Sequence, residues 1–437
     1  MSLDNIELFP ITTRLNESGH VEIGGCDTVE LVSEYGTPLY LYDETTLRII
    51  AREFIDEFTS RYPSTTVAYA SKAFINPVIA DLVNQENLGL DVVSGGELAV
   101  AQSVGFPLNK VYFHGNNKTP QELEAAIKAG IGRIVVDGLY ELSLLNELAG
   151  KVGIKQDIML RLSPGVDPHT HAKTTTGILD SKFGISIDTG DARQAMVQAL
   201  AAENLELVGL HCHLGSPIFE LEPYSIAIDT MLAFAAEFKQ EGFVLREFSP
   251  GGGFAIGYVM SQQPPRIAEY AEAITKTLKT RSADLGLGEP QLVIEPGRSI
   301  VGRAGVALYS VGAVKTIPTI RKYVSLDGGM GDNIRPALYD SSYEAVVANR
   351  PLSPPEEIVT LVGKFCESGD YLIKDINLPT LNQGDIIAIP SSGAYAPSMA
   401  SNYNLNPKPP IVMLKGGDPT LIRRRETYQD MMSTDVW

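Results

Sequence analysis

The sequence predicts an α/β protein, a (β/α)8 barrel of the TIM type followed by a C-terminal all-β domain. Between residues 44 and 305, strand-like runs and amphipathic helical segments alternate eight times, which is the length and rhythm of a closed parallel barrel. From residue 306 the pattern changes to short alternating strands, which indicates a separate β-domain. An open, doubly wound sheet is the alternative for the first region, although such sheets seldom keep so regular an alternation.

The expected elements follow in chain order. Extended runs at 21–23 and 38–42 are expected to pair with strands later in the chain, and apolar residues at helical spacing predict a helix over 44–61. The long connection at 163–182 has the composition of a functional loop. The expected barrel strands are 66–70, 90–94, 110–114, 133–137, 157–162, 205–212, 245–249 and 291–295, and those of the β-domain are 306–317, 323–326, 358–364, 385–389 and 411–414.

The composition excludes several classes of function. The 437 residues carry a net charge of −18, and such an acidic chain does not suit binding to nucleic acid. No run of about 18 apolar residues is present to span a membrane, and no secretory signal is recognisable. The three cysteines form no CxxC pair, which fits a reducing compartment. We therefore expect a cytoplasmic protein that acts on a small molecule.

Lys72 directly follows the first expected barrel strand. An amine at the end of a buried strand is costly to desolvate unless it is neutralised or used covalently, and lysines of lowered pKa commonly form Schiff bases with carbonyl cofactors. Most lysines at strand ends instead extend their amine to water. The position of the other polar residues favours the catalytic interpretation.

In a (β/α)8 barrel, functional side chains gather at the C-terminal ends of the strands. Three consecutive glycines, Gly251, Gly252 and Gly253, follow the seventh strand. Glycines at this place let backbone N–H groups approach a phosphate closely, although they serve equally well as turn residues. The polar residues at the strand ends are Lys72, Asp91, Ser94, His114, His211, His213, Ser216, Glu295 and Arg298.

A lysine, a phosphate-binding loop and a carboxylate in one barrel fit pyridoxal 5′-phosphate. The lysine would hold the cofactor covalently, and Glu295 would keep the pyridine nitrogen protonated. An ion pair of Glu295 with the nearby Arg298 is the structural alternative. His211 and His213 fall on one face of a strand, so a two-histidine metal site is a further alternative, but no third ligand follows at a fitting spacing and we expect no metal.

The β-domain contains three polar segments, 331–336, 366–370 and 393–395, that can contact a substrate and exclude water. Cys366 could be a small buried hydrophobic residue, the commoner fate of a free cysteine. Its acidic and glycine-rich neighbours favour an exposed loop instead.

With these motifs the chain resembles the diaminopimelate decarboxylases, pyridoxal-phosphate enzymes of the alanine-racemase-like fold. The resemblance extends from about residue 35 to Tyr428. Its motifs, in order, are Tyr69-Ala70-Ser71-Lys72-Ala73, His114-Gly115-Asn116-Asn117-Lys118, His169-Thr170-His171, His213-Leu214-Gly215-Ser216, Glu295-Pro296-Gly297-Arg298, Arg335-Pro336-Ala337-Leu338-Tyr339, Cys366-Glu367-Ser368-Gly369-Asp370 and Ser398-Met399-Ala400-Ser401-Asn402-Tyr403-Asn404.

The resemblance implies decarboxylation of meso-2,6-diaminopimelate to L-lysine, the last step of lysine biosynthesis. It implies that Cys366 protonates the carbanion, and that Cys366 and Glu367 reach the site from the partner subunit of an obligate homodimer. Residues 1–43 would join the β-domain, 306–437, and leave 44–305 as the cofactor-binding barrel. The implied cofactor residues are Lys72, Asp91, His213, Ser216, Gly251, Gly252, Gly253, Glu295, Gly297, Arg298 and Tyr395, and the implied substrate residues are Arg298, Arg335, Tyr339, Glu367 and Tyr395.

Asp340 departs from the family pattern, in which glycine is expected after Tyr339, and a Tyr-Asp pair resembles the ornithine decarboxylases. The run from Cys366 to Asp370 instead resembles the diaminopimelate pattern. A decarboxylase of ornithine, arginine or another basic amino acid is therefore one alternative. A non-catalytic binding relative is disfavoured by the presence of Lys72, Glu295 and Cys366 together, and a racemase by the lack of a second tyrosine base in the expected context.

Overall fold

A computed structural model describes residues 5–167, 175–177 and 180–436. The chain divides into two compact units. One comprises Ala51–Ala255 and Pro264–Gly297, and the other comprises Met1–Ile50, Ile256–Gln263 and Arg298–Trp437. The short segment Ile256–Gln263 thus belongs to the second unit although it lies within the sequence expected to form the barrel. Among the described residues, no helix has the length and apolar character needed to cross a membrane.

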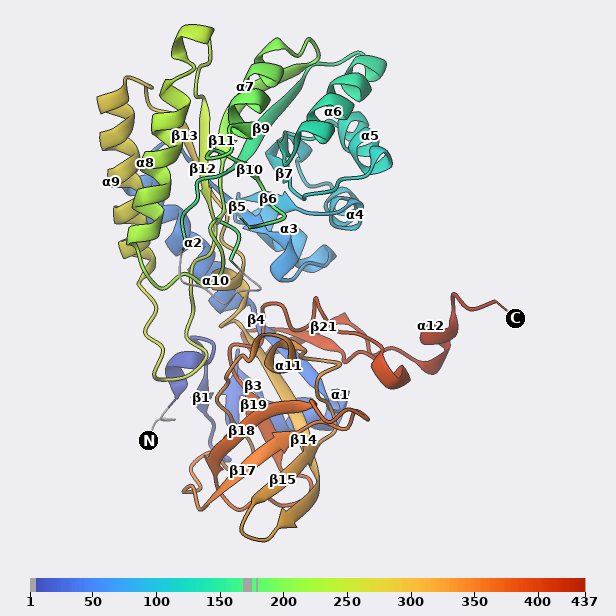
Figure 1. The fold of residues 1–437 in the computed structure, drawn as a ribbon. Coiled ribbons are helices and arrows are strands. Elements are labelled where there is room, and N and C mark those ends of the chain that lie inside the picture. Colours follow the sequence, from blue (N-terminus) through green and yellow to red (C-terminus); the bar gives the residue numbers. More distant parts are fainter. Residues whose placement is uncertain (1–4, 168–174, 178–179, 437) are drawn as a thin grey trace. The chain divides into compact units, whose positions relative to one another are not determined.

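The first unit is a closed barrel of eight parallel strands, as the sequence predicted (Figure 1). Pairing of β8 with β9 and of β13 with β5 completes the ring, and the short β10 (Ile185–Ser186) adds to β9. The barrel strands are β5 Thr65–Ala70, β6 Gly89–Val92, β7 Val111–Phe113, β8 Arg133–Val136, β9 Gln156–Ser163, β11 Leu205–His211, β12 Glu247–Gly251 and β13 Gln291–Ile294.

Local sequence explains where the connecting helices begin and end. Before α5, the side chain of Thr119 accepts the backbone N–H of Glu122 and the Glu122 side chain bonds back, while Pro120 occupies the first turn and a left-handed Gly130 ends the helix. The helices that follow this alternation are α2 Glu44–Arg61, α3 Pro77–Gln85, α4 Gly95–Ser103, α5 Pro120–Ala129, α6 Leu139–Val152, α7 Asp191–Ala201, α8 Glu222–Ala236 and α9 Ile267–Leu285.

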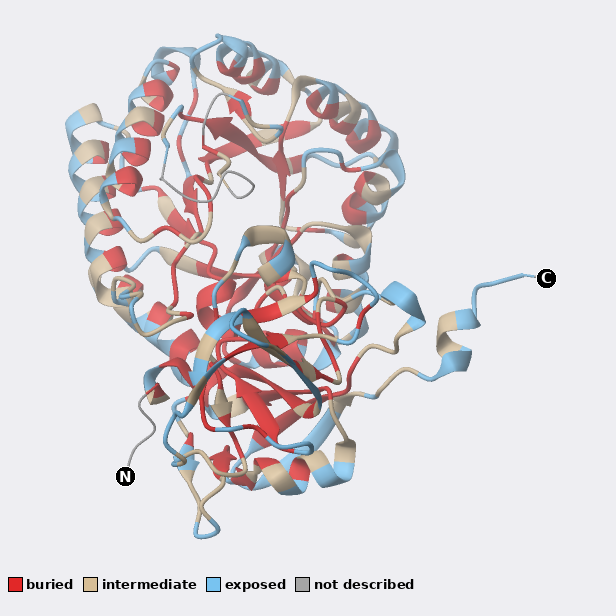
Figure 2. Ribbon diagram, turned by 60° about the horizontal axis from the view of Figure 1, so that its bottom comes forward, coloured by how far each residue is buried: buried red, intermediate tan, exposed pale blue. Residues whose placement is uncertain are grey.

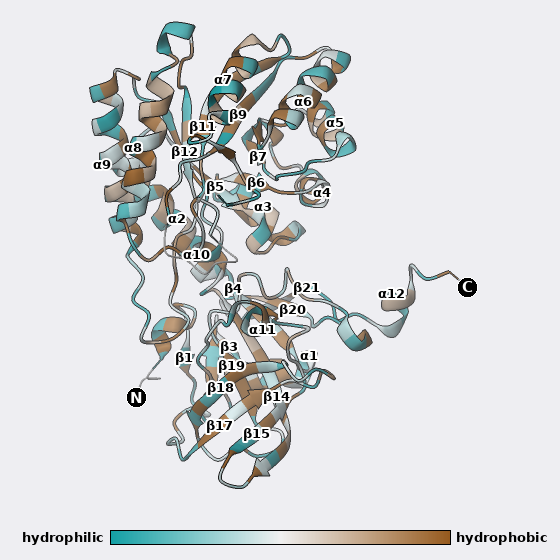
Figure 3. Cartoon of the chain, viewed as in Figure 1, coloured by the Kyte–Doolittle hydropathy of each residue, from teal (hydrophilic) through white to brown (hydrophobic). Residues whose placement is uncertain are grey.

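Apolar side chains from several strands fill a core of the barrel unit. The strands are buried along most of their length, whereas the surrounding helices have a buried and an exposed side (Figure 2). The same helices divide into hydrophobic and hydrophilic sides (Figure 3), as expected when helices cover a parallel sheet. One buried cluster consists of Ala68, Tyr112, Val135, Met159, Val208 and Val293.

The second unit is organised along the long strand β14 (Gly305–Ile317). β14 pairs antiparallel with β4 (Leu39–Asp43), β15 and β19, and β4 also pairs parallel with β20. The early run at 38–42 therefore pairs with later strands, as expected, whereas the run at 21–23 forms β2, which pairs with β1 and β3 of the same N-terminal segment in a separate three-stranded sheet. The remaining elements of this unit are β1 Arg14–Leu15, β2 Val21–Ile23, β3 Cys26–Asp27, α1 Thr28–Tyr35, α10 Arg298–Val301, β15 Arg321–Leu326, α11 Arg335–Tyr339, β16 Val346–Val347, β17 Glu357–Val362, β18 Tyr371–Leu378, β19 Ile386–Ile389, β20 Ile411–Lys415, β21 Asp418–Arg423 and α12 Tyr428–Met432.

A buried ion pair ties the loop after β7 to helix α6. Lys118 Nζ lies 2.8 Å from Glu141 Oε1 and donates to the carbonyl oxygens of Gly115 and Val135 at 2.7 and 2.9 Å. Lys118→Met would leave the Glu141 carboxylate buried without its cation. We expect the free energy of unfolding, measured with urea, to fall by about 3–5 kcal/mol.

The double variant Lys118→Met, Glu141→Leu removes both charges and should recover much of this loss, because no uncompensated ion remains buried. A double variant no more stable than Lys118→Met would contradict the assignment of the loss to an unpaired carboxylate.

Candidate active site

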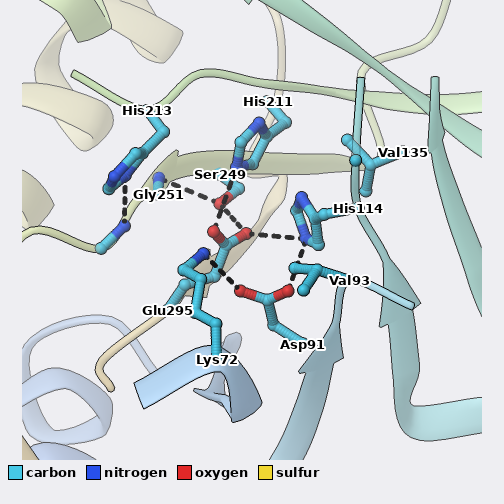
Figure 4. A network of polar contacts seen from close by, with 12 residues as sticks. Lys72, Asp91, Val93, His114, Val135, His211, His213, Ser249, Gly251 and Glu295 are labelled. Carbon is cyan, nitrogen blue, oxygen red and sulfur yellow. Dashed lines mark hydrogen bonds and ion pairs between the residues drawn. The ribbon is translucent and has the colours of Figure 1, made fainter. Parts of the chain in front are cut away.

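Lys72 lies just beyond the C-terminal end of β5, in η2 (Ser71–Ala73), which is one turn of 3-10 helix. Its Nζ is 3.2 Å from Oδ2 of Asp91, which is fully buried on β6 (Figure 4). The Lys72 side chain is 37% exposed, so its amine is only partly removed from water. The turn offers an amine that is paired with a carboxylate and is still accessible to a ligand.

Glu295 follows β13, and its buried carboxylate is contacted from two other strands (Figure 4). Ser249 Oγ donates to Oε1 at 2.9 Å, and His211 Nε2 lies 3.1 Å from Oε2. Burial alone would raise the pKa of Glu295, but His211, through its charge and its contact with the carboxylate, and Lys72 hold that pKa well below its ordinary value. Glu295 is therefore ionised at neutral pH.

Three histidines lie near this carboxylate. His114 Nε2 is 3.5 Å from Glu295 Oε1, and the His114 ring packs edge-on against that of His211 with 4.8 Å between centroids. Burial lowers the pKa of His114 to about 3 and also lowers the pKa of His213, whose Nδ1 accepts the N–H of Gly252 at 3.3 Å. Both rings are therefore neutral at neutral pH.

The structure points to a different set of residues for the alternative of a metal site. Among the described residues, the possible ligand atoms of His114, His211 and Glu295 lie within 4.8 Å of one another, whereas His213 is not part of this group. The pair His211 and His213 that the strand alternation suggested is thus not the group with metal-like geometry.

The three glycines after the seventh strand are required by close packing. Gly251 and Gly253 have φ values of +79° and +97°, and a Cβ on Gly252 would lie 2.1 Å from the carbonyl oxygen of Glu295. These constraints would hold with or without a phosphate, so the role of the loop in phosphate binding stays a prediction. Gly297 is similarly constrained, because a Cβ there would lie 2.9 Å from Ala70 Cβ.

The remaining expected site residues lie in the second unit. Arg298 on α10 and Arg335 on α11 are buried, and the guanidinium carbon of Arg298 is 4.7 Å from the ring centroid of Tyr395. Tyr339 is the last residue of α11, and Asp340 ends this helix with a φ of +52°. Glycine is the usual residue at a left-handed helix end and aspartate is tolerated there, so helix geometry accounts for the departure at Asp340.

Cys366 and Glu367 lie in an exposed loop, as their neighbours in the sequence predicted. The Cys366 N–H donates to Asn404 Oδ1 at 2.8 Å. Beneath the loop, the buried carboxylate of Asp370 accepts the N–H groups of Met330 and Phe365 at 2.7 and 2.9 Å. These bonds fix the backbone of the loop while the thiol stays exposed.

Sequence reasoning missed Ser249 and Tyr258, placed His114 at a strand end without a role, and considered His211 only as a possible metal ligand. Ser249 carried a usable signal, because it lies on the seventh strand two positions before Gly251, on the same face. Tyr258 carried none, since its arginine neighbours come from distant segments. The expected His169 and His171 lie outside the described residues.

Comparisons with known proteins agree along nearly the whole chain. A sequence profile of the family described as "Pyridoxal-dependent decarboxylase, pyridoxal binding domain" matches residues 48–302. The chain is 45% identical to the diaminopimelate decarboxylase of Bacillus subtilis over 97% of both proteins, and 44% identical to that of Halalkalibacterium halodurans, also over 97% of both. A crystal structure of the M. jannaschii diaminopimelate decarboxylase superimposes with a TM-score of 0.92 at 36% identity and covers 98% of each chain.

The low pKa of His114 predicts acid sensitivity. In the unfolded chain this histidine would titrate near the ordinary histidine pKa of 6.5, whereas in the folded protein its pKa is about 3. Below pH 6.5 the unfolded chain binds a proton that the folded protein does not bind, so the free energy of unfolding decreases as the pH is lowered. Between pH 7 and 5 we expect the wild type to lose about 2 kcal/mol more than His114→Gln, as measured by urea unfolding. Equal losses in the two proteins would contradict a neutral buried His114.

Proposed function

Because the chain belongs to the diaminopimelate decarboxylase family of pyridoxal-dependent enzymes, we propose that it converts meso-2,6-diaminopimelate to L-lysine and carbon dioxide. Its cofactor is pyridoxal 5′-phosphate. The observation that carries the proposal is the accessible amine of Lys72 at the same barrel end as the ionised carboxylate of Glu295. This reaction would be the last step of lysine biosynthesis.

The residues at this barrel end fit the cofactor. Three buried polar atoms there, Asp91 Oδ1, His114 Nε2 and His211 Nδ1, have no hydrogen-bond partner among the described residues. Lys72 supplies an amine for an aldehyde and Glu295 an anion for a pyridinium nitrogen. Ser216, Gly251, Gly252, Gly253, Gly297, Arg298 and Tyr395 would complete the binding site, together with the ring of His213.

When bound, pyridoxal phosphate supplies an electron sink for the charge left on the α-carbon as carbon dioxide departs. Lys72 would hold the cofactor, with its amine oriented by Asp91. Glu295, kept ionised by Ser249 and His211, would favour the protonated form of the ring nitrogen. Cys366 would deliver the proton to the α-carbon, since it is an exposed thiol on a loop with a fixed backbone.

Substrate selection would rest on charges that match both groups at the distal end of meso-diaminopimelate. Glu367 can accept the distal ammonium, and Arg298 and Arg335 can bind the distal carboxylate. Tyr339 would contact the same substrate. Ornithine and arginine lack that second carboxylate and would leave a buried guanidinium unpaired, which disfavours them by several kcal/mol.

We also propose a homodimer with shared active sites. Cys366 and Glu367 are exposed in the single chain, although catalytic groups must be shielded from water during the reaction. A second copy of the chain would cover them. The cytoplasmic location expected from the cysteine content stays a prediction.

The direct test measures carbon dioxide release by the protein loaded with pyridoxal phosphate. We expect kcat/KM for meso-diaminopimelate to exceed that for ornithine, arginine and lysine by about 100-fold or more. Lys72→Ala should lose nearly all turnover and the covalent retention of the cofactor after borohydride reduction, while the far-UV circular dichroism is unchanged. A higher kcat/KM for ornithine or arginine would overturn the proposed substrate.

Mixing two inactive variants tests whether the sites are shared. Lys72→Ala and Cys366→Ala should each be poor enzymes, but exchange of subunits forms heterodimers in which one site contains both residues. We expect about a quarter of the wild-type activity if exchange is statistical, since half of the dimers are mixed and each has one intact site. Exchange is verified with a tag on one variant. Mixed dimers without activity would place Cys366 in the site of its own subunit or outside the chemistry.

A further inference from the structure

Tyr258 lies between the two buried arginines of the second unit. Arg298 Nη1 donates to the Tyr258 hydroxyl at 2.6 Å, and the guanidinium carbon of Arg335 lies 4.3 Å from the centroid of the Tyr258 ring. Arg335 also donates to the hydroxyl of Tyr343, whose ring meets that of Tyr258 edge-on at 5.3 Å. One phenol therefore contacts both guanidinium groups.

Arg335 is held without a carboxylate. It is 5% exposed, and no acidic side chain of the described residues forms an ion pair with it. Burial of a cation is costly, and contact with the face of an aromatic ring offsets part of that cost. The tyrosines thus fix the guanidinium in place and leave its charge available to an anionic ligand.

We propose that Tyr258 is a positioning residue that sets the preference for substrates with a second carboxylate, because it orients Arg298 and Arg335 together as one receptor for that group. This inference rests on the proposed function, which assigns the two arginines to the distal carboxylate. To the arginines of the proposed function, the inference adds Tyr258, which contacts both and sets their orientation toward a carboxylate.

The charges around Tyr258 add a dependence on pH. Burial alone would raise the pKa of Tyr258, but Arg298 and Arg335 outweigh burial and hold the pKa below its ordinary value. Tyr343, whose ring meets that of Tyr258, has a raised pKa because it is buried. As pH rises, Tyr258 is the first of the two to ionise, and its phenolate then competes with the substrate carboxylate for the guanidinium groups.

The test compares Tyr258→Phe with the wild-type holoenzyme. The variant keeps the ring and loses the hydroxyl, so we expect KM for meso-diaminopimelate to rise about 10-fold, with kcat changed less than twofold. Inhibition by L-lysine, which retains a carboxylate, should weaken by a similar factor, whereas inhibition by cadaverine, which has none, should not change. The fall in substrate affinity on raising the pH from 8 to 10 should be smaller in the variant.

Tyr62→Phe is the matched control, because it also removes a buried tyrosine hydroxyl, one that donates to the carbonyl of Pro290 at 2.6 Å in the barrel unit. This variant should keep the wild-type KM, inhibition and pH profile. If inhibition by L-lysine and inhibition by cadaverine weakened equally in Tyr258→Phe, or if neither changed, the inference would be overturned. If the wild type does not decarboxylate meso-diaminopimelate, the proposed function is wrong. The inference about Tyr258 can then still be tested by calorimetry, which compares the affinity of the wild type and of Tyr258→Phe for L-lysine.

Discussion

The buried carboxylate of Glu295 is the charge on which the arrangement of the barrel end depends. An ionised carboxylate cannot be buried at acceptable cost without hydrogen-bond donors or positive charge beside it. Here the neighbours come from other strands, with Ser249 on β12 and His211 at the end of β11. β11, β12 and β13 are successive strands of the barrel sheet, so their parallel pairing places Ser249 and His211 beside the carboxylate, and these contacts help to keep it ionised.

In the second unit the buried charges are positive, and they are stabilised by a different kind of contact. Arg298 and Arg335 contact tyrosine rings and hydroxyls. An aspartate or glutamate beside Arg335 would stabilise it more strongly, but would also occupy the charge that a substrate carboxylate needs. Aromatic contacts are a compromise, because they reduce the cost of burial and leave the cation able to bind an anion.

The sequence predicted the barrel strands well because parallel strands buried on both faces form compact apolar runs. It missed β18 and β21, which are the two edges of the large sheet in the second unit. Both carry exposed polar residues, such as Lys374 and Asp375 on β18, so neither shows a clear pattern of burial. The position of Lys72 could be predicted from its strand, but its exposure depends on the 3-10 turn. The contact between His114 and His211 could not be predicted, because it joins the ends of β7 and β11, which are not neighbours in the barrel.

The position of β4 constrains the order in which a newly made chain can fold. This strand lies between β14 and β20, so its partners are separated from it by the whole barrel sequence and, for β20, by most of the β-domain. Barrel strands pair largely with their neighbours in the sequence, and contacts between distant segments form more slowly. During synthesis the barrel can therefore close while β4 is still unpaired. Because β4 carries Leu39, Tyr40, Leu41 and Tyr42 and is fully buried in the finished protein, an incomplete chain presents an uncovered strand edge that can recruit other chains into aggregates.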